Sequence, residues 1–136
     1  MISIAQGEWE IVDQGKTVHC EGMTSCGLVL AFSTTGRVAC YHWPFMSGHY
    51  LSTFDGILAH LRSEGGDIIL VQVFANDFPN DASKAHCLAT VHAIASLPGG
   101  APTECYIHPG EVQGKDALVT LWPDGAQSLH PVGRIV

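Results

Sequence analysis

A short apolar run near the middle of the chain constrains the fold more than any other feature. Ile68–Val71 is too short and too rich in β-branched side chains for a helix, which predicts a buried strand within Asp67–Ala75. Helical patterns flank it, over Ser52–Glu64 and Ala82–Leu97. The expected inward stripes are Phe54, Ile57, Leu58 and Leu61 in the first helix and Cys87, Leu88, Val91, Ile94 and Ala95 in the second. This strand must therefore find its partners elsewhere in the chain.

Both ends of the chain have the composition of paired strands. The predicted strands are Glu8–Val12, Lys16–Cys20, Leu28–Phe32, Arg37–Trp43, Thr103–His108, Ala117–Trp122 and Ser128–Ile135. The first two are expected to form a hairpin around Asp13-Gln14-Gly15, and Pro123-Asp124-Gly125 to be a turn between the last two. Strand pairs at both ends with two helices between them predict one α+β layered domain over residues 1–136, rather than a doubly wound sheet.

Composition excludes several classes of function. The formal net charge is −7 and the six lysines and arginines are scattered, so a nucleic-acid partner is not expected. No apolar stretch reaches the ~18 residues of a membrane span. Without a secretory-signal pattern, the chain is expected to be cytoplasmic or exported without a cleaved signal. Five cysteines, an odd number with no zinc-type spacing, predict free thiols and no structural zinc.

Cys26 and His42 are the candidate catalytic residues. Cys26 follows a polar loop and opens an apolar strand, and His42 lies on the next strand, beyond the turn at Ser33–Gly36. A turn of Ser33-Thr34-Thr35 would place the two residues directly opposite, and one of Thr34-Thr35-Gly36 diagonally, on the same face in both cases. A two-residue turn would place them on opposite faces. A histidine base beside a thiol is what nucleophilic catalysis requires.

Neighbouring residues are candidates for supporting roles. The backbone amides near Ser25–Gly27, at the junction of loop and strand, are free to point at an oxyanion. Trp43, next to His42, is either a wall of a substrate cleft or ordinary strand packing.

The same residues carry a resemblance to a known family. Thr24-Ser25-Cys26-Gly27-Leu28-Val29-Leu30, Gly36-Arg37-Val38-Ala39 and His42-Trp43-Pro44 are similar to the chemoreceptor glutamine deamidase (CheD) family. The Cys–His arrangement also resembles that of cytotoxic necrotizing factor (CNF) toxins and related bacterial effectors. The order of the later elements agrees with this resemblance, which implies a β-sandwich-like mixed-sheet core with helices packed outside.

The resemblance also implies an activity: hydrolysis of a glutamine side chain on another protein by Cys26 and His42, without metal or cofactor, or transglutamination if an amine replaces water. In the family, a threonine hydroxyl or a backbone carbonyl orients the histidine. Because position 20 is a cysteine, a carbonyl near Cys20 or the side chain of Thr24 is left for that role. The residues that follow the central strand, Phe74-Ala75-Asn76, replace the family's Gly-Gly-Ala. The alternatives are a non-catalytic protein-binding domain on the same scaffold and a metal-dependent hydrolase using several of the eight histidines.

Overall fold

The computed structural model of the chain describes residues 2–20, 26–44, 50–76, 81–108, 117–120 and 131–135. For residues 26, 75, 76, 81, 83, 84, 86, 87, 106–108, 117–120 and 131–135 it describes the backbone only. The strands are β1 (Ile2–Ile4), β2 (Trp9–Asp13), β3 (Thr17–Cys20), β4 (Cys26–Ser33), β5 (Arg37–Pro44), β6 (Ile68–Asn76), β7 (Thr103–His108), β8 (Ala117–Thr120) and β9 (Pro131–Ile135). The helices are α1 (Tyr50–Ser63) and α2 (Asp81–Ala95). The predicted α+β class is therefore confirmed.

The strands form two sheets. One has the order β2-β5-β4-β6-β7 and is antiparallel except where β7 lies parallel to β6. That parallel pair follows from the helical connection through α2, because parallel neighbours need a long crossover. The other sheet has the order β1-β3-β8-β9 and joins strands from both ends of the described chain. The predicted strand at Asp67–Ala75 is thus β6, next to the middle strand β4.

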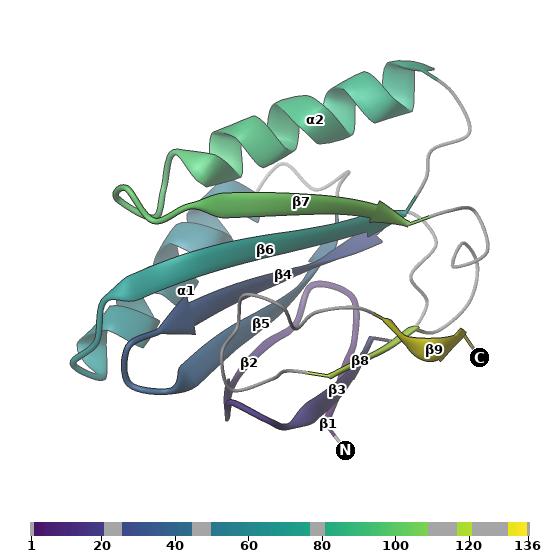
Figure 1. Cartoon of the computed structure of the whole chain (residues 1–136). Helices are drawn as coiled ribbons and strands as arrows, with labels where there is room; N and C mark the ends of the chain where they lie inside the picture. The colour runs from purple at the N-terminus through teal and green to yellow at the C-terminus, as the bar shows by residue number, and fades with distance from the viewer. Residues whose placement is uncertain are drawn as a thin grey trace.

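Two apolar layers lie on opposite faces of the five-stranded sheet. One face packs on the smaller sheet, through a cluster that includes Val18, Leu28 and Phe32. The other face packs on the helices, through a cluster that includes Val29, Trp43 and Leu58. The alternation of side chains along β4 and β5 explains how each strand serves both layers. Figure 1 shows α1 behind this sheet and the β1-β3-β8-β9 sheet on its other side.

The predicted stripe of buried residues is confirmed for α1 and is wrong for part of α2. Phe54, Ile57, Leu58 and Leu61 of α1 are all buried, as predicted. In α2, Ile94 is buried and Val91 packs against the same cluster, but Leu88 is 44% exposed and Ala95 is exposed. Thr90 is buried instead, so the inward face of α2 is rotated from the predicted stripe. The predicted position of the Cys87 side chain lies outside the described residues. In β6, Ile69 is 47% exposed, contrary to the expectation of a fully buried run.

The hairpin predicted for the first two strands is wrong. β2 pairs with β5, whereas β3 pairs with β1 and β8 in the other sheet. The turn around Gly15, which has φ 89°, carries the chain from one sheet to the other. Val12 and Val18 consequently belong to the same buried cluster between the sheets, although their strands lie in different sheets. A turn does form at Gln14 and Gly15, but a turn does not dictate which strand becomes the partner.

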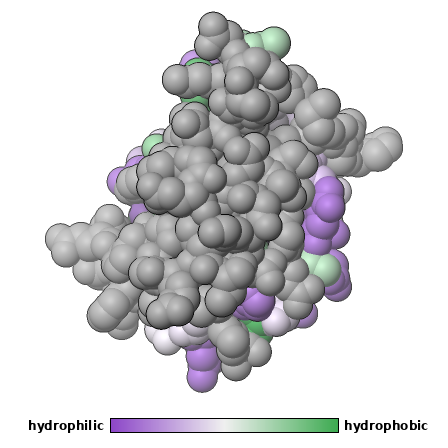
Figure 2. Space-filling model, turned by 90° about the vertical axis from the view of Figure 1, so that its right-hand side faces the viewer, coloured by the Kyte–Doolittle hydropathy of each residue, from purple (hydrophilic) through white to green (hydrophobic). Residues whose placement is uncertain are grey.

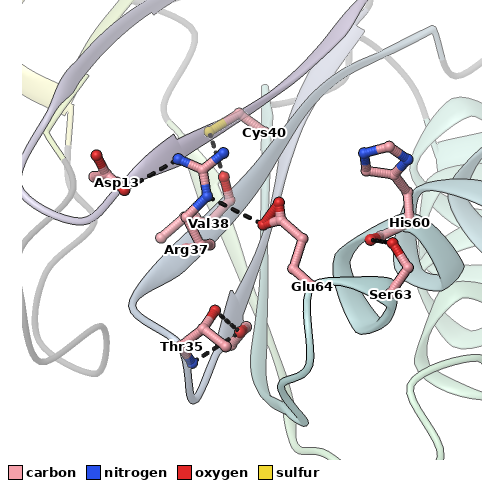
Figure 3. A network of polar contacts seen from close by, with 9 residues as sticks. Asp13, Thr35, Arg37, Val38, Cys40, His60, Ser63 and Glu64 are labelled. Carbon is pink, nitrogen blue, oxygen red and sulfur yellow. Dashed lines mark hydrogen bonds and ion pairs between the residues drawn. The ribbon is translucent and has the colours of Figure 1, made fainter.

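The turn between β4 and β5 is held by contacts from several elements. Arg37 forms ion pairs with Asp13 at 3.0 Å and with Glu64 at 3.1 Å, which ties β5 to the end of β2 and to the residue after α1 (Figure 3). These carboxylates raise the pKa of the Arg37 guanidinium, chiefly through their hydrogen bonds. Within the turn, the Ser33 hydroxyl accepts a hydrogen bond from the Thr35 amide at 3.0 Å. The turn is thereby fixed to the rest of the domain.

Among the residues that the structure describes, no helix is long and apolar enough to cross a membrane.

Candidate active site

The β4–β5 register places Cys26 and His42 on the same face of the sheet. Cys26 is paired with Pro44, and His42 with Leu28. The two residues are therefore diagonal neighbours, which confirms the register expected for a Thr34-Thr35-Gly36 turn. Gly36 has φ 84°, the left-handed conformation that a glycine in the last position of such a turn provides. Diagonal neighbours lie about 7–8 Å apart between Cα atoms, within reach of long side chains.

His42 is completely buried and held through one ring nitrogen. Its side chain is 0% exposed, and its Nδ1 lies 2.9 Å from the carbonyl oxygen of Ile4. A carbonyl can only accept, so Nδ1 is the protonated nitrogen in this contact. In the neutral ring Nε2 is then the basic nitrogen. The Ile4 carbonyl thus selects the tautomer in which Nε2 can take a proton.

The Ile4 carbonyl lies directly before a turn that connects the two sheets. The Glu8 amide donates to the Ala5 carbonyl at 3.0 Å, and Gly7, at φ 82°, occupies the third position of this turn. The Gly7 amide donates to the His42 carbonyl at 2.9 Å, and the His42 amide donates to the Glu8 carbonyl at 3.0 Å. Two residues opposite one, with a left-handed glycine first, make a glycine-type β-bulge. The bulge places the connection between β1 and β2 next to the backbone of His42.

The backbone carbonyl that contacts His42 lies on the strand next to Cys20. β1 runs parallel to β3, and Ile4 is paired with Cys20. The carbonyl on His42 therefore comes from the strand beside Cys20, which agrees with the expectation of a backbone carbonyl near that residue. Cys20 itself is buried in the cluster between the sheets. Thr24, the alternative orienting residue, lies outside the described residues.

Cys26 is the first residue of β4, and the structure describes its backbone. The backbone groups of His42 bond to the β2 side, so Leu28 and His42 form a non-hydrogen-bonded pair. By alternation, the Gly27 backbone groups are directed toward β5, and those of Cys26 toward β6. The oxyanion role expected of the Gly27 amide is therefore corrected, because that amide belongs to the β4–β5 ladder. Ser25, the other candidate, lies outside the described residues.

Trp43 is not the wall of a cleft beside His42. It is 0% exposed and belongs to the cluster under the helices, on the opposite face of the sheet from His42. Its indole ring lies 5.5 Å from the ring of Tyr50 at the start of α1, between centroids. Adjacent residues of a strand point to opposite faces, so proximity in sequence separates these two side chains.

The other described thiols are poorly suited to nucleophilic attack. Burial, then the neighbouring Cys20 thiol and the Glu10 carboxylate, strongly raise the pKa of Cys40. Desolvation likewise raises the pKa of Cys105, which is exposed on β7. A thiol with a raised pKa holds its proton near neutral pH, so it supplies little thiolate.

Sequence reasoning missed the two residues that organise His42. Ile4 acts through its backbone, so no side-chain signature could have revealed it. Gly7 carries a readable signal, because Ala5-Gln6-Gly7-Glu8 has glycine at the third position of a possible turn. Among the described residues, no three His, Cys, Asp or Glu side chains come together in a way that could hold a metal ion.

The described residues that are visible from one side of the molecule are mostly polar. β6 and β7 end on the side of the molecule where β4 begins (Figure 1). Seen from that side, the described residues are mostly hydrophilic, with scattered hydrophobic ones (Figure 2). No family model matches the chain, and no curated protein matches it.

Proposed function

We propose that this chain is a cysteine-dependent amidohydrolase that converts a glutamine side chain of another protein to glutamate. The observation that carries the proposal is the Nδ1 contact of His42 with the Ile4 carbonyl, on the sheet face and in the register of Cys26. A histidine held in one tautomer beside a cysteine is the arrangement that activates a thiol. We further propose the fold of the glutamine deamidases and CNF toxins, which the layered arrangement of sheets and helices supports.

The proposed reaction proceeds through a thioester. His42 Nε2 takes the Cys26 thiol proton, and the thiolate attacks the carboxamide carbon to form a carbon–sulfur bond. Backbone amides around Ser25 and Cys26 stabilise the resulting oxyanion. His42 returns the proton to the departing nitrogen, the carbon–nitrogen bond breaks, and ammonia leaves. Water, deprotonated by His42, then attacks the thioester, and the carbon–sulfur bond breaks to give glutamate and the thiol. An amine in place of water would give transglutamination.

The test measures ammonia release from benzyloxycarbonyl-Gln-Gly, and a one-dalton mass gain on glutamine-bearing protein substrates. Cys26→Ala should abolish both, because no other group forms the thioester. His42→Asn should be nearly as severe while retaining an N–H donor for the Ile4 carbonyl, which His42→Ala would leave buried and unpaired. The double variant should be scarcely worse than either single one, since the two residues act as a unit.

Cys105→Ala is the matched control, because it removes an exposed thiol from β7 and should retain full activity. Ammonia release by Cys26→Ala at the wild-type rate would refute the proposal. Loss of activity in Cys26→Ala together with a large fall in Tm would also count against it, because Cys26 would then be a core residue.

A further inference from the structure

An open groove lies between α2 and the last strand of the five-stranded sheet. Its volume is about 410 Å³, and the described residues that line it are Leu88, Val91, His92 and Ala95 of α2 and Thr103 of β7. Figure 1 shows α2 lying along β7 at this edge of the sheet. The four α2 residues have the spacing of one helix face. Three of them belong to the apolar stripe that was expected to point inward, and Leu88 and Ala95 are exposed instead.

β7 is the edge strand on this side of the sheet. Among the strands that the structure describes, only β6 is paired with it. The Val71 amide donates to the Pro102 carbonyl at 2.9 Å, in the register that pairs Val71 with Thr103. In a parallel ladder, this directs the Pro102 carbonyl and the Glu104 amide toward β6. The backbone groups of Thr103 and Cys105 alternate with them and are therefore directed away from β6, to the open side.

The described side chains of β7 at this edge lie on the same face of the sheet as α2. Thr103 is paired with Val71 and Cys105 with Val73, and both valines belong to the cluster under the helices. Paired residues share a face, so Thr103 and Cys105 lie on the α2 side. Cys105 is exposed, and Thr103 Oγ1 is buried without a hydrogen-bond partner among the described residues. A strand added here would place every second side chain on this face, against the groove.

The chemistry of the groove indicates what occupies it. A row of unpaired backbone donors and acceptors complements an extended chain. Among the described lining residues only His92 is titratable, and it is exposed, so an apolar side chain can enter without burying a charge. A second copy of the chain is disfavoured, because each copy carries a formal charge of −7 and like charges repel.

We propose that β7 and α2 bind an extended segment of another protein, which adds to the sheet as an antiparallel strand and inserts apolar side chains into the groove. The outward backbone groups of Thr103 and Cys105 hold the strand. Leu88, Val91 and Ala95 enclose its apolar side chains. The backbone of the added strand also passes next to the Thr103 hydroxyl and offers it a hydrogen-bond partner. This surface is separate from the proposed catalytic pair.

Fluorescence anisotropy of a labelled probe peptide tests the proposal. The probe is the fluorescein-labelled peptide Ser-Thr-Leu-Thr-Leu-Thr-Ser, in which the two leucines fall on one face of an extended strand. We expect saturable binding with a Kd below about 1 mM. A bound strand covers the edge, so the probe should also slow the alkylation of exposed Cys105 by iodoacetamide, measured by peptide mass spectrometry.

N-methylation of the probe tests the strand geometry. Residues opposite Thr103 and Cys105 have their side chains on the groove face and their backbone groups directed toward β7. N-methylation of the two leucines should therefore weaken binding at least about five-fold, through the loss of backbone hydrogen bonds. The amide of the central threonine is directed to solvent, so its N-methylation should leave Kd unchanged.

Variants of the protein test the groove. Leu88→Lys replaces one good helix former with another and should weaken binding about ten-fold, because an apolar wall is lost. Ala95→Leu fills the groove without adding a charge and should also weaken binding. Ile69→Lys is the matched control: Ile69 is 47% exposed, Leu88 is 44% exposed, and Ile69 is not among the described residues that line the groove. Circular dichroism establishes that each variant is folded.

The outcomes are distinct. The proposal is overturned if the probe does not bind, if both N-methylated peptides bind equally well, or if Leu88→Lys and Ala95→Leu bind as tightly as the wild type. Dimers that the probe dissociates, measured by sedimentation equilibrium, would assign the groove to a second copy and overturn the choice of partner. Cys26→Ala should bind the probe like the wild type, so this result is independent of the deamidase test.

Discussion

Gly66, in the connection between α1 and β6, has no room for a side chain. A Cβ at this position would lie 2.6 Å from Thr35 Cγ2, 2.7 Å from Ser33 Oγ and 3.0 Å from Thr34 Oγ1. All three atoms belong to the β4–β5 turn. We therefore predict that Gly66→Ala destabilises the domain by forcing apart this turn and the connection.

The size of the effect follows from how firmly the three atoms are held. Ser33 Oγ accepts from the Thr35 amide at 3.0 Å and lies 2.6 Å from Thr35 Oγ1, while Thr34 Oγ1 accepts from the Asp67 amide at 3.0 Å. None of them is the free end of a flexible side chain, so the clash is relieved only by breaking hydrogen bonds or shifting backbone. Overpacking of this kind costs about 1–3 kcal/mol.

Urea denaturation monitored by circular dichroism measures the change in the free energy of unfolding. Gly56→Ala is the matched control: Gly56 is exposed within α1, and a Cβ there meets nothing within 4 Å. It should stabilise the protein by about 0.5–1 kcal/mol, because alanine is the better helix former. The steric reasoning would be refuted if Gly66→Ala were as stable as the wild type.

Three further predictions concern the surroundings of the candidate site. Gly7→Ala should lower the free energy of unfolding by about 1–2 kcal/mol, because alanine is strained in the left-handed conformation of this residue. It should also lower kcat more than it raises KM, because the bulge beside His42 shifts. Trp43→Phe should lower stability in denaturation experiments but leave KM unchanged, since Trp43 packs under α1; a raised KM would restore it as a cleft residue. The raised pKa of buried Cys40 keeps the folded thiol neutral while the unfolded one ionises, so stability falls as the pH rises past an ordinary thiol pKa. Cys40→Ala should make that alkaline slope shallower by about 1.4 kcal/mol per pH unit, and an unchanged slope would contradict it.

Local patterns predicted the elements well because each is a property of a short stretch of chain. The period of α1, the apolar run of β6 and the turn at Gly36 all depend on neighbouring residues. One of the alternative turns considered from the sequence, Thr34-Thr35-Gly36, gives the observed register of Cys26 and His42. The partner of β2 was not predictable in this way. Its pairing with β5 involves buried residues that are distant in sequence, such as Val12 and Val38.

Some residues of the candidate site could likewise be predicted from the sequence, and others could not. The sequence showed the thiol and the imidazole, because they are side chains with a recognisable spacing. It could not show that Ile4 supplies the acceptor for His42, since every residue has a carbonyl and only the tertiary fold selects one. The assignment of Trp43 failed for a related reason: a strand separates neighbouring side chains, and which face is covered by helices is a property of the whole sheet.

The placement of β1 also has a consequence for the order in which parts of the protein fold. The β4–β5 hairpin closes over a short turn, whereas the Ile4 carbonyl contacts His42 across a sequence separation of 38 residues. Contacts between segments so far apart in sequence form slowly, because a long loop must be closed first. We therefore expect refolding to recover the helical signal before Cys26, the proposed nucleophile, gains its reactivity, because the His42 ring acquires its carbonyl partner late. Newly made chains would then pass through a compact state in which Cys26 is not yet activated.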